Sequence, residues 1–376
     1  MRKIIMGVLL FIICGLFLSG GYEKKDIFEV LDETCTERGV RWEWLINPGE
    51  YQDVIILDEN FIGVKNESGQ YGFINSNKEL VADFQYFNII DENENIVTVI
   101  DADKKWTFID FKGKKISRES YDEAHSFREG RAAVKKGNQW GFIDAEGNIA
   151  LACQFDDVKT GYHDKFAAVE KDGQWFFIDY EGNNVFQKYF EDVNDFYEGY
   201  AGAKSGGKWG FINSEGQWII EPEYNEVGNF SEGLAAVKSC VNGVEQWAYI
   251  NTQNEVIIGY SIYDTCEGRL ATAGEFKNGY ALVSKTLYCL MDKSGNIVLG
   301  DDSYFLTLGS DYGNSKGWIF AYQYKDSEME NRAYGLIDIE GNVVLPLVFD
   351  YVMGMKGDLA AVVYNQKTGM LRCRES

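Results

Sequence analysis

Histidine is the first residue type to weigh for chemistry, and the sequence contains two, His125 and His163. An imidazole group can bind zinc or act as a general base near neutral pH. The two histidines are 38 residues apart. No HExxH, GxSxG, Walker A or GxGxxG motif occurs in a fitting context. We therefore predict surface or core histidines, with no catalytic residues, no metal site and no cofactor.

A glutamate recurs in an FxEG pattern at Glu129, Glu198 and Glu232. These carboxylates could gather at one rim as a cation-binding crown, or each could accept backbone amide hydrogen bonds inside its own turn. We favour the second interpretation, because polar side chains in turns commonly bond to nearby backbone. The same turn role is expected of a second set of acidic residues, Asp144, Asp179, Asp292 and Asp338. Their DAEG and DYEG contexts lack the alternating oxygen ligands of a calcium loop.

The charge of the chain excludes one class of partner. Asp and Glu number 59 against 36 Lys and Arg, which gives a net charge of −23. Such an acidic surface repels phosphate backbones, and basic residues gather at most in pairs, so we expect no nucleic-acid partner. A carboxylate pair for a glycoside hydrolase could hide among so many acids. Because no spacing singles out such a pair, we expect no enzyme.

The pentapeptide Trp-Gly-Phe-Ile-Asp at residues 140–144 returns, intact or altered, every 34 or 35 residues through the middle of the chain. Spacing this regular indicates tandem structural repeats of about 35 residues. The first aromatic residue of each copy is expected to belong to the structural core of its repeat. These residues are Tyr71, Trp106, Trp140, Trp175, Trp209, Trp247, Tyr288 and Tyr334.

Each repeat has the pattern of short β-strands. Two apolar runs, 131–135 and 140–143, are separated by Lys-Gly-Asn, which predicts a β-hairpin. The next four residues, Asp-Ala-Glu-Gly, suit a turn into a returning strand. Apolar residues point to both faces of these strands, as in sheets that stack on one another. The glycine after tryptophan is expected to leave room for a neighbouring large side chain.

The segments WGFIDAEG and WGFINSEG, preceded at a fixed distance by FREGRAAVKK and FSEGLAAVKS, resemble the WG-repeat family of β-rich repeats that is common in bacterial proteins. The resemblance covers roughly residues 51–370. It implies a binding or scaffolding array without shared catalytic residues. The sequence departs from the pattern where Thr107 and Phe176 replace the motif glycine and Lys78 replaces a turn glycine. The repeat intervals also widen to 38, 41 and 46 residues after Trp209, which predicts loops.

These patterns predict an all-β fold, either a β-propeller of eight or nine small blades or an open β-solenoid. The two ends of the chain favour the propeller. Residues 42–46 resemble a returning strand, whereas the hairpin at residues 359–372 lacks one. An N-terminal strand that completes the last blade would remove exposed edges. We therefore expect a repeat domain at residues 51–376 and an N-terminal segment, residues 22–50, that supplies the closing strand.

Residues 1–21 resemble a secretory signal peptide. Arg2 and Lys3 precede an uncharged apolar run from Ile4 to Leu18, and small residues follow. The run falls short of the roughly 20 apolar residues of a membrane span. Cleavage is therefore expected, and an uncleaved leader would be the one means of membrane attachment. The expected location is extracytoplasmic, secreted or associated with the cell envelope.

Aromatic residues late in the chain are candidates for a contact surface, because they lie in the divergent stretches. They are Tyr304, Tyr312, Trp318, Tyr322 and Tyr324. Exposed rings could contact a protein or stack on a sugar. Protein scaffolding is the usual role of a repeat array with divergent loops. We predict a secreted, non-enzymatic protein-interaction scaffold at the cell envelope, with a cell-wall or glycan-binding module as the alternative and a glycoside hydrolase third.

Overall fold

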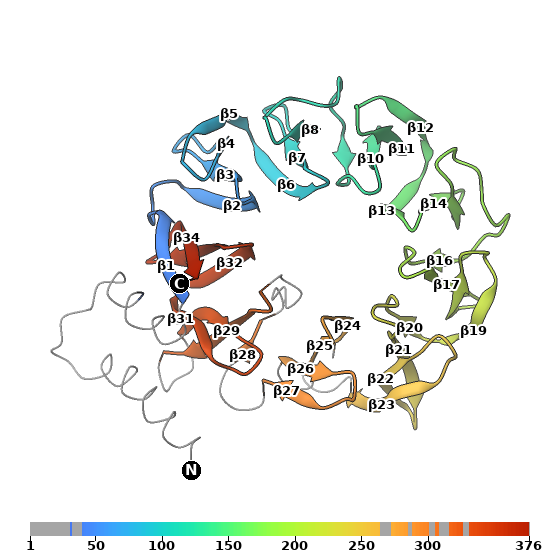
Figure 1. Cartoon of the computed structure of the whole chain (residues 1–376). Coiled ribbons are helices and arrows are strands. Elements are labelled where there is room, and N and C mark those ends of the chain that lie inside the picture. Colours follow the sequence, from blue (N-terminus) through green and yellow to red (C-terminus); the bar gives the residue numbers. More distant parts are fainter. Residues whose placement is uncertain are drawn as a thin grey trace, which may run out of the picture. The chain divides into compact units, whose positions relative to one another are not determined.

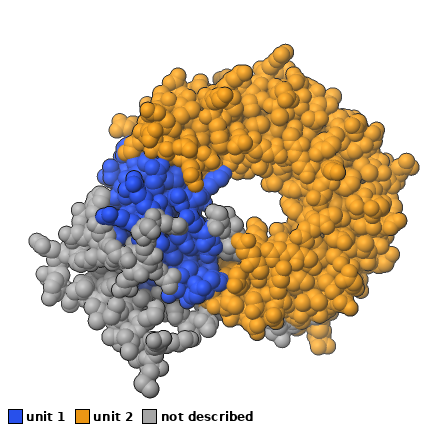
Figure 2. Space-filling view, viewed as in Figure 1, with its two compact units in different colours: residues 1–50, 303–376 blue, residues 51–302 orange. Residues whose placement is uncertain are grey.

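The computed structural model describes residues 31, 40–263, 272–284, 288–300, 305–307, 316–325 and 331–375. The chain comprises two compact units, coloured separately in Figure 2: unit 1 contains residues 1–50 and 303–376, and unit 2 contains residues 51–302. The predicted leader and the predicted contact residues Tyr304 and Tyr312 lie outside the described residues. Within the described part, no helix has the length and apolar character needed to cross a bilayer.

The described residues of unit 2 form seven antiparallel sheets, each built from strands that are consecutive in the sequence. These sheets, called blades here, follow one another along an arc, and the first strand of each lies on its inner side (Figure 1). Blades 1 to 4 contain β2 (Asp53–Asp58), β3 (Phe61–Lys65), β4 (Tyr71–Ile74) and β5 (Leu80–Tyr86); β6 (Asn88–Asn93), β7 (Ile96–Ile100) and β8 (Trp106–Asp110); β9 (Glu123–Ala124), β10 (Arg131–Lys136), β11 (Gln139–Asp144) and β12 (Ile149–Phe155); and β13 (Asp157–His163), β14 (Phe166–Lys171) and β15 (Gln174–Ile178). Blades 5 to 7 contain β16 (Asp192–Val193), β17 (Tyr200–Ser205), β18 (Lys208–Asn213) and β19 (Trp218–Tyr224); β20 (Glu226–Val227), β21 (Ala235–Val241), β22 (Val244–Ile250) and β23 (Val256–Tyr263); and β24 (Ala273–Lys277), β25 (Tyr280–Ser284), β26 (Tyr288–Asp292) and β27 (Ile297–Leu299).

The middle strands of each blade are the apolar runs of the repeat. In blade 3, β10 and β11 form the expected hairpin, with Lys136 opposite Gln139 at its turn. Residues 132–134 and 140–143 are all buried, so side chains on both faces of these strands are covered. Small and β-branched residues in β10 and aromatic residues in β11 fit this two-sided burial. The prediction of strands covered on both faces is confirmed.

The glycine after tryptophan is required by the backbone of the next strand. A Cβ atom on Gly141 would lie 2.5 Å from the carbonyl oxygen of Leu151, because β12 bulges where it passes this position. The equivalent atom on Gly210 would lie 2.4 Å from the carbonyl oxygen of Ile220. The prediction that this glycine makes room for a large side chain is therefore wrong at both positions, since a neighbouring backbone fills the space.

Two blades of the described part have three strands, and both lack this glycine. Thr107 and Phe176 occupy the glycine position of blades 2 and 4. The chain that follows each third strand pairs with it only through isolated bridges, such as those that end at Lys115 and Asn184. Side chains as large as these accompany a fourth segment that pairs only locally, whereas Ala248 and Cys289 occupy the same position in blades 6 and 7, whose fourth strands stay paired.

The hydrophobic core of unit 2 lies between its blades. Six clusters of buried side chains are each shared by two consecutive blades of the described part. At the junction of blades 3 and 4, Phe142 packs against Tyr162 with ring centroids 5.1 Å apart. Each blade is therefore stabilised by its neighbours, as expected of tandem repeats.

Unit 1 contains two further blades in its described residues. Blade 8 consists of β28 (Phe305–Leu306), β29 (Ile319–Tyr324), β30 (Arg332–Ile337) and β31 (Val343–Phe349), and blade 9 of β32 (Tyr351–Lys356), β33 (Leu359–Tyr364), β34 (Lys367–Glu375) and the N-terminal β1 (Val40–Ile46). β1 runs antiparallel to β34, with Trp42 opposite Cys373. The Nε1–H of Trp42 donates to the carbonyl oxygen of Val344 at 2.9 Å, and its ring lies 5.6 Å from that of Trp318.

The N-terminal and C-terminal strands therefore share one blade. An open solenoid would leave these strands in different sheets, whereas a propeller combines them. The described residues form nine sheets of this kind. The fold is a β-propeller arrangement of nine blades, the larger of the two predicted numbers.

Candidate functional site

The structure buries part of the predicted contact surface. Trp318 and Tyr322 are each 8% exposed, and Tyr324 is half-buried. The prediction of exposed loop residues is wrong at Trp318 and Tyr322. Tyr322 belongs to β29, a central strand of blade 8, and Trp318 directly precedes that strand and packs against Trp42. Strand residues that face a neighbouring blade are covered in the same way as those of the regular repeats.

Tyr322 and Tyr324 instead belong to a continuous group of aromatic rings in unit 1, here called the Tyr–Arg cluster. The cluster consists of Phe305, Tyr322, Tyr324, Arg332, Tyr334 and Tyr351. Tyr351 is 46% exposed, and Arg332 is also exposed. The guanidinium carbon of Arg332 lies 4.6 Å from the ring centroid of Tyr322 and 5.8 Å from that of Tyr324. This cluster is the described group with the side-chain types of a binding surface.

The predicted core positions of the repeats differ in how far they are covered. Four of them are buried: Tyr71, Trp140, Trp175 and Trp247. The other four are half-buried: Trp106, Trp209, Tyr288 and Tyr334. At several of these positions a lysine covers the ring, as Lys135 covers Trp140 at 5.2 Å. In blade 4, Lys159 of the first strand covers Trp175 at 4.2 Å.

A ladder of carboxylates connects the turns of neighbouring blades in unit 2. Glu198 and Gly199 form the centre of such a turn, with positive φ angles of 54° and 79°. Glu198 accepts the N–H groups of Glu232 at 2.6 Å and Gly233 at 2.9 Å, which belong to the turn of the next blade. Four equivalent links continue the ladder between blades 2 and 7: Glu94 to Gly130, Glu129 to Lys165, Asp164 to Gly199 and Glu232 to Gly279.

The prediction that each FxEG carboxylate bonds inside its own turn is therefore wrong. The glutamate adopts a left-handed conformation, which is uncommon for this residue type, and its side chain reaches amides of the following repeat. The second acidic set does bond locally, as when Asp144 accepts the N–H groups of Glu146 at 3.1 Å and Asn148 at 2.8 Å. Backbone amides thus engage both sets of carboxylates.

Replacing Glu198 by alanine should lower the free energy of unfolding by about 1 kcal/mol. The change removes two charge-assisted hydrogen bonds, whose value is reduced because the carboxylate is exposed. Urea denaturation of the Glu198→Ala variant would measure the loss. Glu146→Ala removes an exposed turn glutamate and should change stability by less than about 0.5 kcal/mol. Equal effects of the two variants would contradict a stabilising role for the ladder.

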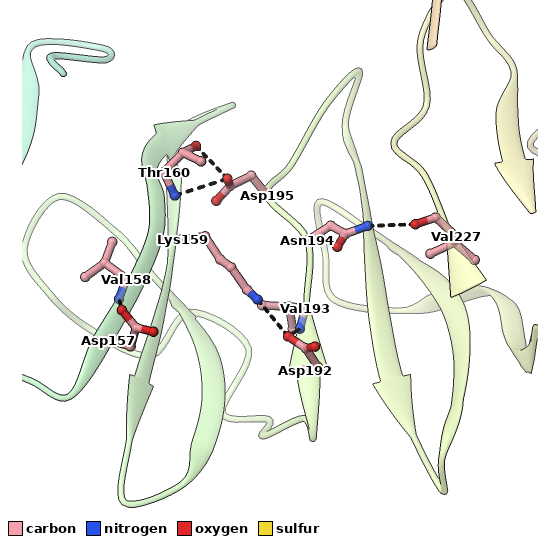
Figure 3. A network of polar contacts seen from close by, with 9 residues as sticks. All are labelled: Asp157, Val158, Lys159, Thr160, Asp192, Val193, Asn194, Asp195 and Val227. Atoms are coloured by element: carbon pink, nitrogen blue, oxygen red, sulfur yellow. Dashed lines mark hydrogen bonds and ion pairs between the residues drawn. The ribbon is translucent and has the colours of Figure 1, made fainter. Parts of the chain in front are cut away.

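A second set of links joins the first strands of blades 4 to 6 (Figure 3). Thr160 donates its hydroxyl to Oδ2 of Asp195 at 2.6 Å, and its backbone N–H donates to the same oxygen at 3.3 Å. The Nζ atom of Lys159 lies 2.8 Å from Oδ1 of Asp192. Asn194 donates to a carbonyl oxygen of β20 at 3.3 Å. Sequence reasoning missed these links, although Thr160 and Asp195 occupy corresponding positions 35 residues apart.

His163 enters this network through Thr160. Its Nε2 atom lies 2.8 Å from Oγ1 of Thr160, which gives its one proton to Asp195. While Asp195 is ionised, His163 must therefore donate from Nε2. In a Ser–His–Asp triad the carboxylate bonds to the other ring nitrogen. Here His163 and Asp195 share one hydroxyl and are 9% and 7% exposed, so the arrangement links blades and holds no activated nucleophile.

Both histidines are predicted surface or core residues, and the structure buries His163 and half-buries His125. The His125 ring stacks on Trp140 at 4.8 Å, and the His163 ring lies 4.6 Å from that of Tyr197. Burial lowers the pKa of each histidine and raises the pKa of Asp195. Oδ1 of Asp195 is buried without a hydrogen-bond partner among the described residues. In the same part of the chain, no three His, Cys, Asp or Glu side chains are grouped to hold a metal ion.

Acidification should destabilise the protein as the pH falls through 6.5, the ordinary histidine pKa. The unfolded chain takes up these protons at a higher pH than the folded protein, so folding loses free energy in this range. The contribution of Asp195 to the stability change has the opposite sign. Its raised pKa means that the folded state takes up this proton before the unfolded chain does as the pH falls. NMR titration of the two imidazoles, assigned with a His125→Asn variant, would measure the histidine pKa values directly. A His163 pKa above 6.5 would contradict its burial as a neutral group.

Six segments of the chain match the family model described as the WG containing repeat. They are residues 106–140, 140–175, 175–209, 209–239, 247–286 and 334–367. Together these segments cover more than half of the 376 residues. The matches include the aromatic core positions of blades 2 to 6 and of blade 8. Tyr288 of blade 7 lies between two matched segments. No curated protein matches the sequence.

Solved structures resemble this chain at low sequence identity. A eukaryotic initiation factor shares 10% identity, with a TM-score of 0.50 over 78% of this chain and 87% of that chain. A KlHsv2 variant with loop 6CD replaced by a Gly-Ser linker shares 10% identity, with a TM-score of 0.37 over 77% of this chain and 99% of that chain. The WD40 β-propeller domain of Doa1 shares 10% identity, with a TM-score of 0.31 over 65% of this chain and 94% of that chain.

Proposed function

Because this chain belongs to the family of WG containing repeats, we propose that it is a secreted, non-enzymatic scaffold that binds a protein partner at the cell envelope. Propeller blades hold their connecting turns on a rigid frame, which suits them to protein recognition. The ladder of carboxylates adds links between successive blades of unit 2. A frame of this kind can present a binding surface at low entropic cost.

The observation that carries the proposal is the Tyr–Arg cluster of unit 1. Tyrosine and arginine are enriched among the residues that dominate binding energy at protein interfaces. The exposed members, Tyr351 and Arg332, are held by packing against half-buried rings. Groups that are ordered before binding lose little side-chain entropy when a partner arrives.

The proposed location rests on residues 1–21. Their two basic residues, apolar run and small residues have the pattern of a secretory leader. The acidic composition also suits solubility outside the cell. The proposed absence of enzyme activity rests on the use of carboxylates in turns and on the shared hydroxyl of His163 and Asp195.

The proposal is tested by binding to intact producing cells. The labelled chain without its predicted leader, residues 22–376, is incubated with cells before and after treatment with a surface protease. Binding that the protease abolishes would support a protein partner. Binding that survives and is competed away by purified wall glycan would replace the proposal with the glycan-binding alternative. An absence of any binding would contradict a role at the envelope.

A further inference from the structure

We propose that the Tyr–Arg cluster docks a protein segment in which a carboxylate neighbours an aromatic or large aliphatic side chain. This inference rests on the proposed scaffold function and specifies its partner. The carboxylate would bind Arg332, and the apolar side chain would contact Tyr351 and Tyr324. All of these residues belong to unit 1.

Arg332 supplies the charge that such a segment would recognise. Its guanidinium lies over the rings of Tyr322 and Tyr324, and no carboxylate pairs with it among the described residues. Stacking covers a face of the guanidinium, and hydrogen bonds to Tyr334 and Tyr324 use part of its edge. The remaining N–H donors of its five can bind a ligand. A carboxylate can accept two of these donors in a bidentate geometry. An arginine held in this way is prepared for a carboxylate ligand.

Arg332 is the one charged residue of the Tyr–Arg cluster. Lys325 follows Tyr324, and its Nζ atom lies 3.7 Å from Oδ1 of Asp350, the residue before Tyr351. Because this pair cancels, Arg332 carries the one charge within the Tyr–Arg cluster that no described carboxylate neutralises. Charges beyond about 8 Å are largely screened at physiological salt. A segment with one or two carboxylates therefore fits the site, whereas a long acidic tract would be repelled by the rest of the surface.

The apolar side of the cluster crosses from blade 8 to blade 9. The Tyr334 and Tyr351 rings are in edge contact at 5.1 Å, and Phe305 lies 5.1 Å from Tyr324. Tyr351 is the most exposed of these rings at 46%. An aromatic or aliphatic partner side chain can pack on it and shield the ion pair from water.

The same geometry disfavours a sugar. Stacking on a sugar needs a broad ring face that is open to solvent. Tyr322 is 8% exposed, with Phe305 stacked on it at 5.0 Å and Arg332 at 4.6 Å. Its faces are therefore occupied, and the most exposed ring of the cluster, Tyr351, is packed edge-on against Tyr334. The cluster suits a mixed charged and apolar contact of the kind found between proteins.

The test uses a library of random twelve-residue peptides displayed on phage, selected on the chain without its predicted leader. Selected peptides should be enriched in Asp or Glu beside an aromatic or aliphatic residue. Synthetic copies should bind Arg332→Gln about 10- to 100-fold more weakly than wild type, because the ion pair is lost. Arg332→Lys should bind the peptides about tenfold more weakly, since lysine keeps the charge but lacks the paired N–H donors of the guanidinium group. Tyr351→Ala should also bind the peptides about tenfold more weakly.

Tyr189→Ala is the matched control, because Tyr189 is a 57% exposed tyrosine in unit 2. This variant should bind the selected peptides as wild type does. Failure to enrich carboxylate-containing peptides, or equal binding by Arg332→Gln, would overturn the inference. The inference and the proposed function can fail independently. If Arg332→Gln and Tyr351→Ala leave protease-sensitive binding to cells intact, the scaffold function is supported and this docking surface is rejected.

Discussion

Replacing Trp42 by alanine is expected to lower the free energy of unfolding by about 3–5 kcal/mol, the usual cost of deleting a buried tryptophan ring. Trp42 is 3% exposed in β1, and its ring packs against Trp318. Alanine would leave a cavity and remove the hydrogen bond to the carbonyl oxygen of Val344. The effect should be large because β1 is the strand that pairs with the outer edge of β34 among the described residues.

Urea denaturation measured by circular dichroism checks this expectation. Arg41→Ala, on the exposed side of the same strand, is the control and should cost less than about 1 kcal/mol. A Trp42→Ala variant as stable as the control would show that β1 contributes little to blade 9. The same variant should aggregate more readily, because a loosened β1 exposes the edge of β34.

Replacing Gly141 by alanine should destabilise the protein by about 3 kcal/mol, the upper end of the usual cost of overpacking. The new Cβ atom would lie 2.5 Å from Leu151 O and 2.7 Å from the nitrogen of Cys153, both backbone atoms of β12. Backbone in a paired strand cannot move aside as a flexible side chain can. The expected response is a local displacement of β12 away from β11, since β23 passes Ala248 at the equivalent position of blade 6 and remains paired with β22.

Gly259→Ala provides the matched control. Nothing lies within 4 Å of a Cβ atom at Gly259, and its φ angle is not in the left-handed region. Alanine there should be neutral or stabilising by up to about 1 kcal/mol, since it restricts the unfolded chain. Thermal unfolding of the two variants tests the difference. Equal melting temperatures would mean that close approach of β12 is not the reason for glycine.

The repeat period and the hairpins could be predicted because they depend on local sequence. Tryptophan, glycine and alternating apolar residues determine where β10 and β11 begin, and the structure has the hairpin at the expected residues. The role of Gly141 could not be predicted, because the atom that excludes a side chain belongs to Leu151, ten residues later. Sequence shows that glycine is required without showing what approaches it.

Contacts between repeats were the harder part to predict. Glu198 is recognisable as a turn residue, but the sequence does not show that its carboxylate reaches the turn of the next blade. Tyr322 lies in a divergent stretch, which favours a loop, yet β29 continues through it and buries its ring. Arg332 belongs to no motif, and its importance comes from the stacked rings beside it. These features depend on which strands become neighbours.

The central claim is that this chain binds a protein through the Tyr–Arg cluster. Its most direct test places a photo-crosslinking amino acid at Tyr351, with a second variant carrying it at Tyr189, on the chain added to intact producing cells. Irradiation should join one cell-surface protein to the Tyr351 variant and none to the Tyr189 variant. The absence of a crosslinked protein at Tyr351, or equal crosslinking at both positions, would contradict the claim.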